Sequence, residues 1–226
     1  PTLAEYVVTD LDPAVRAECL LAIGDLGTAD WIVSVRPALS DPDPSVVGAA
    51  ILAAGQLGGP EDANRLVTMW EQPGISSWIR LNLMSALAEM RDGRLRPAWW
   101  AVADDAKADP LHRATALWAL GVTLPLEGRT AELTRLTRFL TNDDPRFVNA
   151  TASGLGRAGL VGELTSRLPA ATNACKVEML KAIGEFGAAA DAQAVIGVRG
   201  TTDDASVAGY GAIALSRLGT PGGFRE

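Results

Sequence analysis

His112 is the only histidine in the chain, so it is the one side chain whose ordinary pKa suits acid–base chemistry near neutral pH. Glu89 is the other candidate for a general acid or base. No serine nucleophile has an evident relay with this histidine. Positions equivalent to His112 in the repeats described below hold apolar residues, which favours a packing role. We therefore lean against an enzyme and keep Glu89 and His112 as weak catalytic candidates.

Metal and cofactor motifs are not evident in this sequence. One histidine and two distant cysteines, Cys19 and Cys175, cannot assemble a metal site of the usual nitrogen and sulfur type. The glycines at 154, 156 and 159 imitate a dinucleotide fingerprint but lack the strand–helix context that this motif needs. We expect no metal and no cofactor.

Composition and charge narrow the class of partner. The formal charge is −7, and nucleic-acid binding is disfavoured because its affinity comes largely from Lys and Arg beside phosphates. No stretch approaches 18 uninterrupted apolar residues, and the first ten residues lack a basic segment followed by an apolar one. With two cysteines read as free thiols, we expect a cytoplasmic protein that does not enter a membrane.

The elements that would position any site come from an internal repeat. The segment DPAVRAECLLAIGDLG begins at Asp12, and a near copy, DPSVVGAAILAAGQLG, begins at Asp43. Looser copies follow at spacings of 28 to 35 residues, and each begins with a residue suited to cap a helix N-terminus. The seven expected caps are Asp12, Asp43, Ser76, Asp109, Asp144, Thr172 and Asp204. Glycines after several of these helices, at 27, 58, 159, 187 and 219, predict left-handed C-terminal caps.

Two columns of small residues run through all seven copies. The first column is Ala22, Ala53, Ala86, Ala119, Gly154, Ala182 and Ala214. The second column is Gly24, Gly55, Ala88, Gly121, Gly156, Gly184 and Ser216. Glycine inside a helix costs roughly 0.5–1 kcal/mol relative to alanine, so its recurrence needs a reason. We expect neighbouring helices to approach closely here. In the first copy we expect the core to centre on Val15, Cys19, Ala22, Ile23 and Leu26.

A second apolar-patterned segment precedes most of these helices, at 29–40, 61–70, 129–140 and 190–198. We interpret these as the first helix of each pair and the Asp-Pro helices as the second. We expect Trp31 and Trp70, on such first helices, to be buried. Trp99 and Trp100 are adjacent, so we expect one of them at the surface.

A first helix followed by D-P-x-V-R, an apolar helix and a terminal Leu-Gly resembles the HEAT-like repeat, including its bacterial short form and the repeats of phycobilin lyases. The residues that carry the likeness best are Asp12, Pro13, Val15, Arg16, Leu20, Ala22 and Leu26. The resemblance implies an all-α fold, a right-handed α-α superhelix of about seven helix pairs, as a single domain over residues 1–226. It also implies that Arg16 bonds an acidic helix cap between repeats.

In such solenoids the second helices line the concave face, which makes their outward residues the expected binding surface. The predicted groove consists of Trp78, Leu81, Asn82, Ser85, Glu89, Leu111, Thr115 and Trp118. Further outward residues in later repeats include Asn149, Glu178, Lys181, Glu185, Tyr210 and Arg217. An apolar, aromatic patch on a wet face is typical of an interaction site. If the helix phase is wrong by one position, Trp78 and Trp118 fill the core instead.

These observations favour a HEAT-like scaffold that binds a protein or peptide partner in its groove. The alternative is a bacterial secondary-metabolism enzyme of cyclase or lyase type that holds a small molecule in the Trp-lined groove. Activities like those of alkylpurine DNA glycosylases or phycobilin lyases are less favoured. The last helix, SVAGYGAIALSRLG from residue 206, is poor in polar residues, so pairing with a second copy through this repeat is a further expectation.

Overall fold

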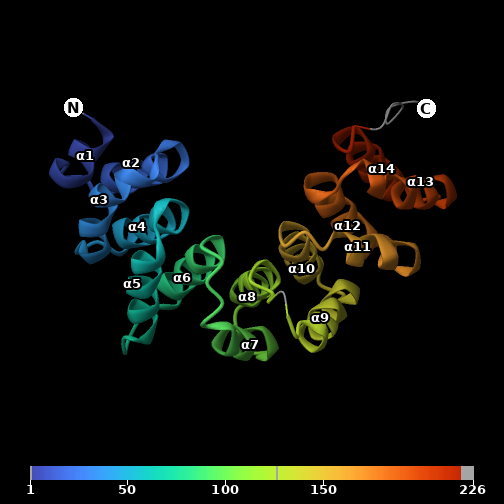
Figure 1. Cartoon of the computed structure of the whole chain (residues 1–226), viewed down its shortest axis with the longest axis horizontal. Coiled ribbons are helices and arrows are strands. Elements are labelled where there is room, and N and C mark those ends of the chain that lie inside the picture. Colours follow the sequence, from blue (N-terminus) through green and yellow to red (C-terminus); the bar gives the residue numbers. More distant parts are fainter. Residues whose placement is uncertain (1, 126, 220–226) are drawn as a thin grey trace. The chain divides into compact units, whose positions relative to one another are not determined.

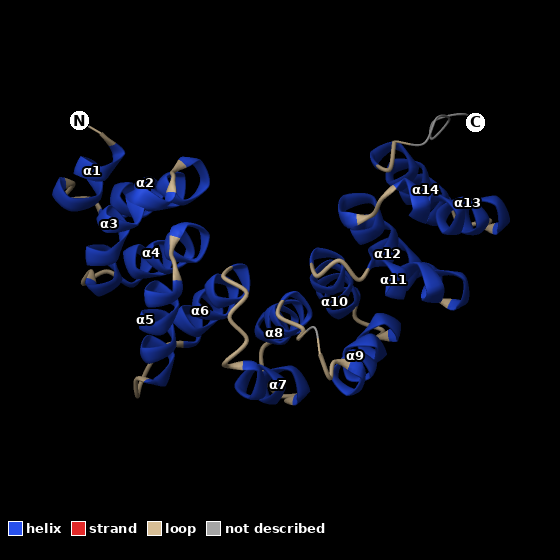
Figure 2. Ribbon diagram, in the orientation of Figure 1, coloured by secondary structure: helices blue, strands red, loops and turns tan. Residues whose placement is uncertain are grey.

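The computed structural model describes residues 2–125 and 127–219 of the chain. These residues form fourteen α-helices and five short 3-10 helices, and no strand occurs among them (Figures 1 and 2). The prediction of an all-α solenoid of helix pairs is confirmed. The chain divides into two compact units, Pro1–Leu95 and Arg96–Glu226, called here the first and second unit. That the two units form one continuous solenoid over residues 1–226 stays a prediction.

The first unit contains three of the expected capped helices, each packed on the next. Its elements are α1 Leu3–Thr9, α2 Pro13–Leu26, η1 Ala29–Trp31, α3 Ile32–Val35, η2 Arg36–Ser40, α4 Pro44–Leu57, α5 Pro60–Glu71 and α6 Ser77–Glu89. We call α2, α4 and α6 the second helices of this unit, because α4 packs against both α2 and α6.

The second unit repeats the arrangement with four second helices, α8, α10, α12 and α14, again packed each on the next. Its elements are α7 Arg96–Asp104, α8 Pro110–Val122, α9 Thr130–Thr137, η3 Arg138–Thr141, α10 Pro145–Arg157, α11 Val161–Arg167, η4 Leu168–Ala170, α12 Asn173–Phe186, η5 Ala189–Asp191, α13 Ala192–Thr201 and α14 Ala205–Arg217. The predicted first-helix segments therefore coincide with helical elements in both units.

All seven predicted N-caps are confirmed. Each of the five aspartates accepts a hydrogen bond from a backbone N–H in the first turn of its helix, at 2.8 to 3.0 Å for the bond to the second residue. Ser76 and Thr172 instead accept from the third residue of α6 and α12. Each cap satisfies N–H groups that have no partner inside the helix, so the start of every second helix is fixed locally.

The small columns mark the places where successive second helices approach most closely. A Cβ built on Gly55 of α4 would lie 2.6 Å from the Cα atom of Ala86 in α6. A Cβ on Gly121 of α8 would lie 2.9 Å from the Cα atom of Gly154 in α10. Both distances are too short for a real side chain, which explains why glycine recurs despite its cost in a helix.

The predicted glycine C-caps are only partly correct. Gly159 and Gly219 have positive φ angles of 77° and 70°, as a left-handed cap requires. Gly27, Gly58 and Gly187 have φ between −76° and −79°, so the left-handed prediction is wrong for them. Their N–H groups donate to the carbonyl four residues earlier, and the extended backbone leads directly into the next helix.

The prediction of which α2 residues are buried is wrong at both ends of the helix. Cys19, Leu20 and Ile23 are buried, whereas Val15 is at the surface and Leu26 is 81% exposed. The preceding helix α1 has seven residues and α2 has fourteen, so α1 cannot cover both ends of its neighbour. Burial also raises the pKa of the Cys19 thiol, which keeps it protonated.

The tryptophans of the first helices depart from expectation in two cases. Trp70 is buried as predicted, but Trp31 is exposed, because it lies in a 3-10 turn where an α-helical register does not apply. Trp99 and Trp100 are both buried, so placing one of them at the surface was wrong. The guanidinium of Arg135 in α9 lies over the Trp100 ring, 3.8 Å from its centre, and covers the side that solvent would otherwise reach.

Ion pairs link neighbouring repeats in the first unit. Arg16 donates two hydrogen bonds to Asp41, at 3.1 and 2.9 Å, so its partner is an acid between repeats, although the helix cap there is Asp43 and not Asp41. Arg36 makes a similar fork on Asp62, at 2.7 and 3.0 Å. These guanidinium hydrogen bonds hold the pKa values of both carboxyl groups below their usual range. The pairs fix the register between repeats.

Candidate functional site

The predicted groove residues of the first unit all lie on α6, but they differ in exposure. Trp78 is 53% exposed, which excludes the alternative that it fills the core. Leu81, Ser85 and Glu89 are half-buried. Asn82 is 4% exposed, so it is not an open groove residue as we expected. On α6 the exposed aromatic side chain therefore stands one turn before a buried amide.

Asn82 is buried without a hydrogen-bond partner for its side-chain nitrogen Nδ2. It lies against Gly48 of α4, where a built Cβ would come within 2.8 Å of that nitrogen. The same built Cβ would lie 3.1 Å from the indole nitrogen Nε1 of Trp78. Two donor nitrogens of α6 thus face the bare backbone of one glycine in α4. A buried donor without an acceptor is costly and therefore unusual in a folded protein.

The outward face of α2 carries two acidic side chains, and α4, which contains no Asp or Glu, lies between α2 and α6. Glu18 and Asp25 are exposed on α2, and Asp25 accepts a hydrogen bond of 3.0 Å from the Gln56 amide on α4. Residues 1–95 contain thirteen Asp and Glu against six Lys and Arg, which is a net charge of −7. Residues 96–226 contain fourteen of each, so the whole negative charge of the chain resides in the first unit.

The remaining predicted groove residues lie on α8 of the second unit. Leu111 is 56% exposed, while Thr115 and Trp118 are half-buried. The Thr115 hydroxyl donates to the Leu111 carbonyl at 2.9 Å, so it is used within the helix. The backbone of Trp118 is where α10 approaches, because a Cβ on Gly154 would lie 2.6 Å from the Trp118 carbonyl oxygen.

The structure gives little support to a catalytic role for His112 or Glu89. His112 is half-buried near the start of α8, and its Nδ1 atom lies 3.5 Å from the carboxylate of Asp109. Asp109 is the N-cap of that helix. Its pKa is lowered mainly by the hydrogen bond from the Leu111 backbone N–H, and next by the hydrogen bond with the His112 side chain. The carboxylate is therefore committed to capping. Glu89 lies at the last turn of α6 in the first unit.

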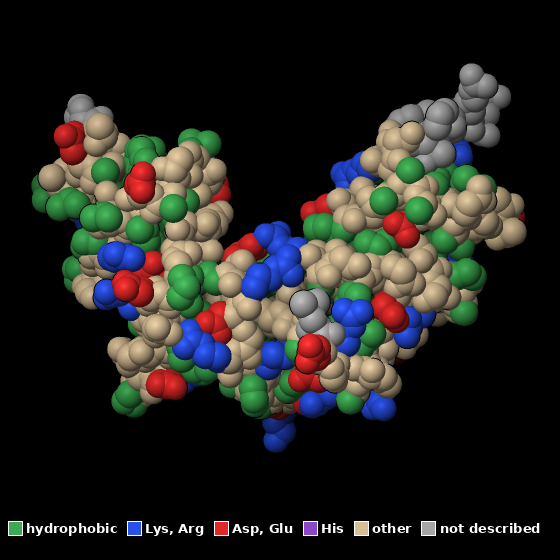
Figure 3. Space-filling view, in the orientation of Figure 1, with side chains coloured by type: hydrophobic (Ala, Val, Ile, Leu, Met, Phe, Trp, Pro, Cys, Tyr) green, Lys and Arg blue, Asp and Glu red, His purple; other side chains and the backbone are tan. Residues whose placement is uncertain are grey.

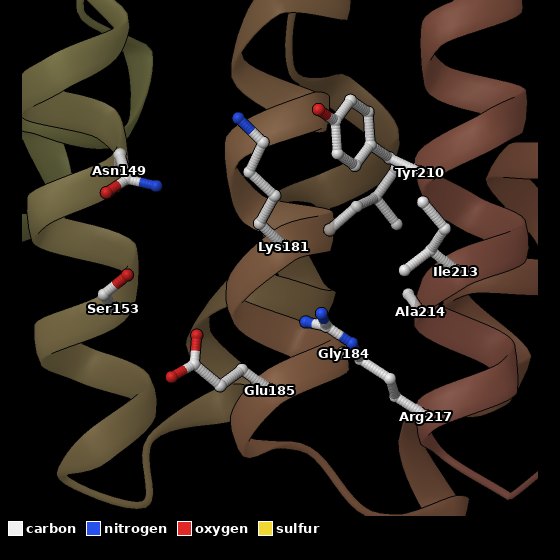
Figure 4. Close-up of a pocket in the computed structure, with 10 residues that line it drawn as sticks. Asn149, Ser153, Lys181, Gly184, Glu185, Tyr210, Ile213, Ala214 and Arg217 are labelled. Atoms are coloured by element: carbon white, nitrogen blue, oxygen red, sulfur yellow. The ribbon is translucent and has the colours of Figure 1, made fainter.

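The second unit contains a hollow of about 360 Å³ between α10, α12 and α14 (Figure 4). Its floor is made by Leu180, Gly184 and Ala214. Its polar rim consists of Asn149, Ser153, Lys181, Glu185, Tyr210 and Arg217. Most of these are outward residues named from the sequence, although the predicted groove lay in earlier repeats. The small side chains at 153 and 184 are the signal that could have located the hollow.

The rim of the hollow is partly ordered by its own contacts. Glu178 accepts from Lys181 at 2.8 Å and from the Asn149 amide at 2.9 Å. The Lys181 ammonium also lies 4.9 Å from the centre of the Tyr210 ring. The Arg217 guanidinium points into the hollow (Figure 4). Acidic and basic side chains occur together on the face of this unit drawn in Figure 3. The hollow therefore suits a polar ligand without a strong preference for either charge.

Residues 2–125 and 127–219 contain neither a metal-binding cluster nor a helix that could span a membrane. No group of three or more His, Cys, Asp or Glu side chains lies together in this part of the chain. Nor is any helix there long and apolar enough to cross a membrane. Cys19 and Cys175 are both buried free thiols.

The comparisons with known proteins agree with the geometry of the first unit. Residues 1–88 match the family model for HEAT repeats, a match that runs from α1 almost to the end of α6. No curated protein matches the sequence closely. The second unit shows the same capped and closely packed second helices. The family match thus covers most of the first unit, whose helix pairs are similar to HEAT repeats.

Proposed function

We propose that this chain is a scaffold that binds a segment of a partner protein on the outward faces of its second helices. The observation that carries the proposal is the exposure of Trp78 on α6. The large apolar neighbours of Trp78 on the same helix, Ile79, Leu83 and Leu87, are all buried. An exposed tryptophan on an otherwise well-buried helix is the kind of residue that anchors partners at protein interfaces.

A second exposed side chain supports the same proposal. Leu111 holds the position in α8 that Trp78 holds in α6, two residues after the N-cap. Both side chains are more than half exposed. Leu81 and Trp118, each half-buried, extend the apolar surface within their own units. A partner segment with apolar anchor residues would remove this surface from water, which is favourable by roughly 25 cal/mol per Å².

Selection from a displayed library of random peptides tests the proposal without a known partner. Binders chosen by the whole chain would be synthesised, labelled and titrated by fluorescence anisotropy against wild type, Trp78→Ala and Trp31→Ala. We expect Trp78→Ala to weaken binding at least about tenfold, as interface hot spots do. Trp31→Ala, which removes an exposed tryptophan elsewhere in the first unit, should change the Kd less than about twofold. Failure to select any binder, or equal binding by both variants, would contradict the proposal.

The small-molecule alternative is favoured by one observation, the hollow of the second unit. Glu185, Tyr210 and Arg217 place a carboxylate, a phenol and a guanidinium on its rim. A thermal-shift screen against metabolites tests this alternative. A compound that raises the melting temperature of wild type but not of Arg217→Ala would support a ligand site there. If no compound raises the melting temperature while the library still yields peptide binders, the peptide-binding scaffold remains the supported function.

The location and assembly of the chain complete the proposal. We place the protein in the cytoplasm, because two buried free thiols suit a reducing compartment. Pairing of two copies through α14 is supported by Ile213, whose side chain is exposed on that helix. Light scattering at several protein concentrations measures this pairing directly, and a monomer mass at all of them would contradict it.

A further inference from the structure

Two side chains of α6 present hydrogen-bond donors without acceptors at one point of the first unit. The Asn82 nitrogen Nδ2 is buried and unpaired. The Trp78 indole nitrogen Nε1 makes no hydrogen bond to another described residue, and the ring is more than half exposed. Both nitrogens face Gly48 of α4, whose missing side chain leaves them room. We call Trp78, Asn82 and Gly48 the α6 notch.

We propose that the α6 notch binds a main-chain peptide group of an extended, positively charged segment of the partner. This inference rests on the proposed function and names the chemistry of its partner. An Asn side chain carries one carbonyl and one NH₂ group, so it matches the N–H and C=O that a peptide group offers. The Trp78 indole N–H adds a second donor for the peptide carbonyl.

The conformation of the segment follows from where its own hydrogen bonds go. In a helix, the interior N–H and C=O groups are already bonded to each other and cannot serve the notch. An extended chain leaves these groups open to a neighbour. The Asn82 amide is therefore more useful to an extended segment than to a helical one. Seating the peptide carbonyl requires the Trp78 ring, which is free on its exposed side, to turn away from Gly48.

The charge of the segment follows from the net charge of the first unit, to which the notch belongs. Residues 1–95 carry a net charge of −7, from thirteen acidic and six basic residues. Glu18 and Asp25 are exposed on α2, next to α4 in the stack. Two of the six basic residues, Arg16 and Arg36, are paired with Asp41 and Asp62, and these pairs leave the net charge of the unit unchanged. A basic segment would be attracted to this unit and an acidic one repelled.

Two labelled peptides of about twelve residues, designed as a Lys-rich sequence and its twin with Glu in place of Lys, test the proposal at physiological ionic strength. Titration uses the whole chain as wild type, Asn82→Leu, Trp78→Phe and the control Asn64→Leu. Leucine copies the shape of asparagine, and phenylalanine keeps an aromatic ring without the indole N–H. Asn64 lies exposed on α5 and accepts a hydrogen bond from Arg94, so its loss probes an amide away from the notch.

We expect the Lys-rich peptide to bind wild type at least about tenfold more tightly than its Glu twin. Asn82→Leu should weaken the Lys-rich peptide about tenfold, and Trp78→Phe severalfold, as loss of a hydrogen bond to a buried partner does. Asn64→Leu should leave the Kd within about twofold. Binding should also shift the side-chain amide signal of Asn82 and the indole signal of Trp78 in the nitrogen–proton NMR spectrum. Each signal is assigned by its absence from the corresponding variant.

Several outcomes would overturn the inference. Equal binding of the Lys-rich peptide by wild type and a folded Asn82→Leu variant would mean that the peptide is held by electrostatic attraction alone and does not contact the notch. Stronger binding of the Glu twin would refute the charge assignment. If neither peptide binds while library-selected peptides still require Trp78, the notch chemistry is wrong and the proposed scaffold function stands. If library selection fails as well, both are wrong. Far-UV circular dichroism and melting of each variant show that it is folded.

Discussion

Replacing Gly121 by alanine should destabilise the second unit, although alanine is the better helix former. A Cβ at this position would lie 2.8 Å from the carbonyl carbon and 2.9 Å from the Cα atom of Gly154 in α10. Both are backbone atoms, so no side chain can rotate away and α8 and α10 must separate. Overpacking of this kind costs about 1–3 kcal/mol, and the helix preference of alanine returns up to about 1 kcal/mol. We expect a net loss of about 1–2 kcal/mol.

Gly197→Ala is the matched control, because it makes the same chemical change in the same unit. Gly197 lies inside α13, is exposed, and has no atom within 4 Å of a built Cβ. Only the helix preference of alanine then acts, so the variant should gain about 0.5–1 kcal/mol. Identical substitutions in one unit should therefore move the stability in opposite directions.

Urea unfolding followed by far-UV circular dichroism measures both variants. The slope of the transition must match wild type for the two midpoints to be compared, since units of a repeat protein can unfold separately. Gly55→Ala offers the same test in the first unit, where the built Cβ lies 2.6 Å from the Cα atom of Ala86. A Gly121→Ala variant as stable as wild type would show that α8 and α10 do not meet at Gly154, which would refute the reasoning about the small columns.

Three other predictions concern single contacts. Asp62→Ala should cost about 1–2 kcal/mol at neutral pH, because it removes two charge-assisted hydrogen bonds from Arg36, whose side chain still reaches solvent. The folded-state pKa of Asp62 is lowered, so this contribution is fully present above the unfolded pKa of about 3.9 and is lost as the pH falls through the folded-state pKa. The free energies of unfolding of wild type and variant, measured by urea titration, should therefore converge at low pH. A difference that stays constant with pH would contradict the assignment. Arg135→Ala should uncover Trp100, shift its fluorescence to longer wavelength and cost about 0.5–1 kcal/mol; unchanged emission would refute the stacking. Asn82→Leu should raise stability by about 1 kcal/mol, because it removes a buried amide nitrogen without an acceptor, and a clear loss of stability would mean that the amide has a partner.

The positions of the second helices were predictable because their signals are local. A cap such as Asp43 acts on N–H groups two residues away, so the sequence around it contains the whole interaction. The small columns were predictable for a different reason. The same contact recurs between successive second helices, so it leaves the same mark at Gly55 and Gly121, and the repetition makes the mark visible.

The burial of the first-helix tryptophans was not predictable, because it depends on contacts from distant segments. Adjacent residues on one helix point about 100° apart, so Trp99 and Trp100 can both be buried only if two neighbours cover the helix. One cover is the long side chain of Arg135, more than thirty residues later, which packs its charged end over a ring. Helix periodicity alone contains no information about that side chain.

The candidate site was predictable at the level of helix faces and not at the level of single groups. The outward columns correctly placed Trp78 and Leu111 at the surface. The same columns placed Asn82 in the open, yet it is buried against Gly48. A missing side chain on the neighbouring helix created that burial. The sequence contains both residues but does not show that they face each other.

The division between stacking and outward columns suggests where specificity can reside in this chain. Positions such as Gly121 and Gly154 are constrained from both sides, because any added atom meets a backbone. Outward positions such as Trp78 carry no such constraint, so their side chains can change without moving the helices. Asn82 belongs to neither class, since it is buried but contributes an unpaired amide instead of packing. The proposed bond to a partner gives a reason for a residue that costs stability at a position where leucine would fit.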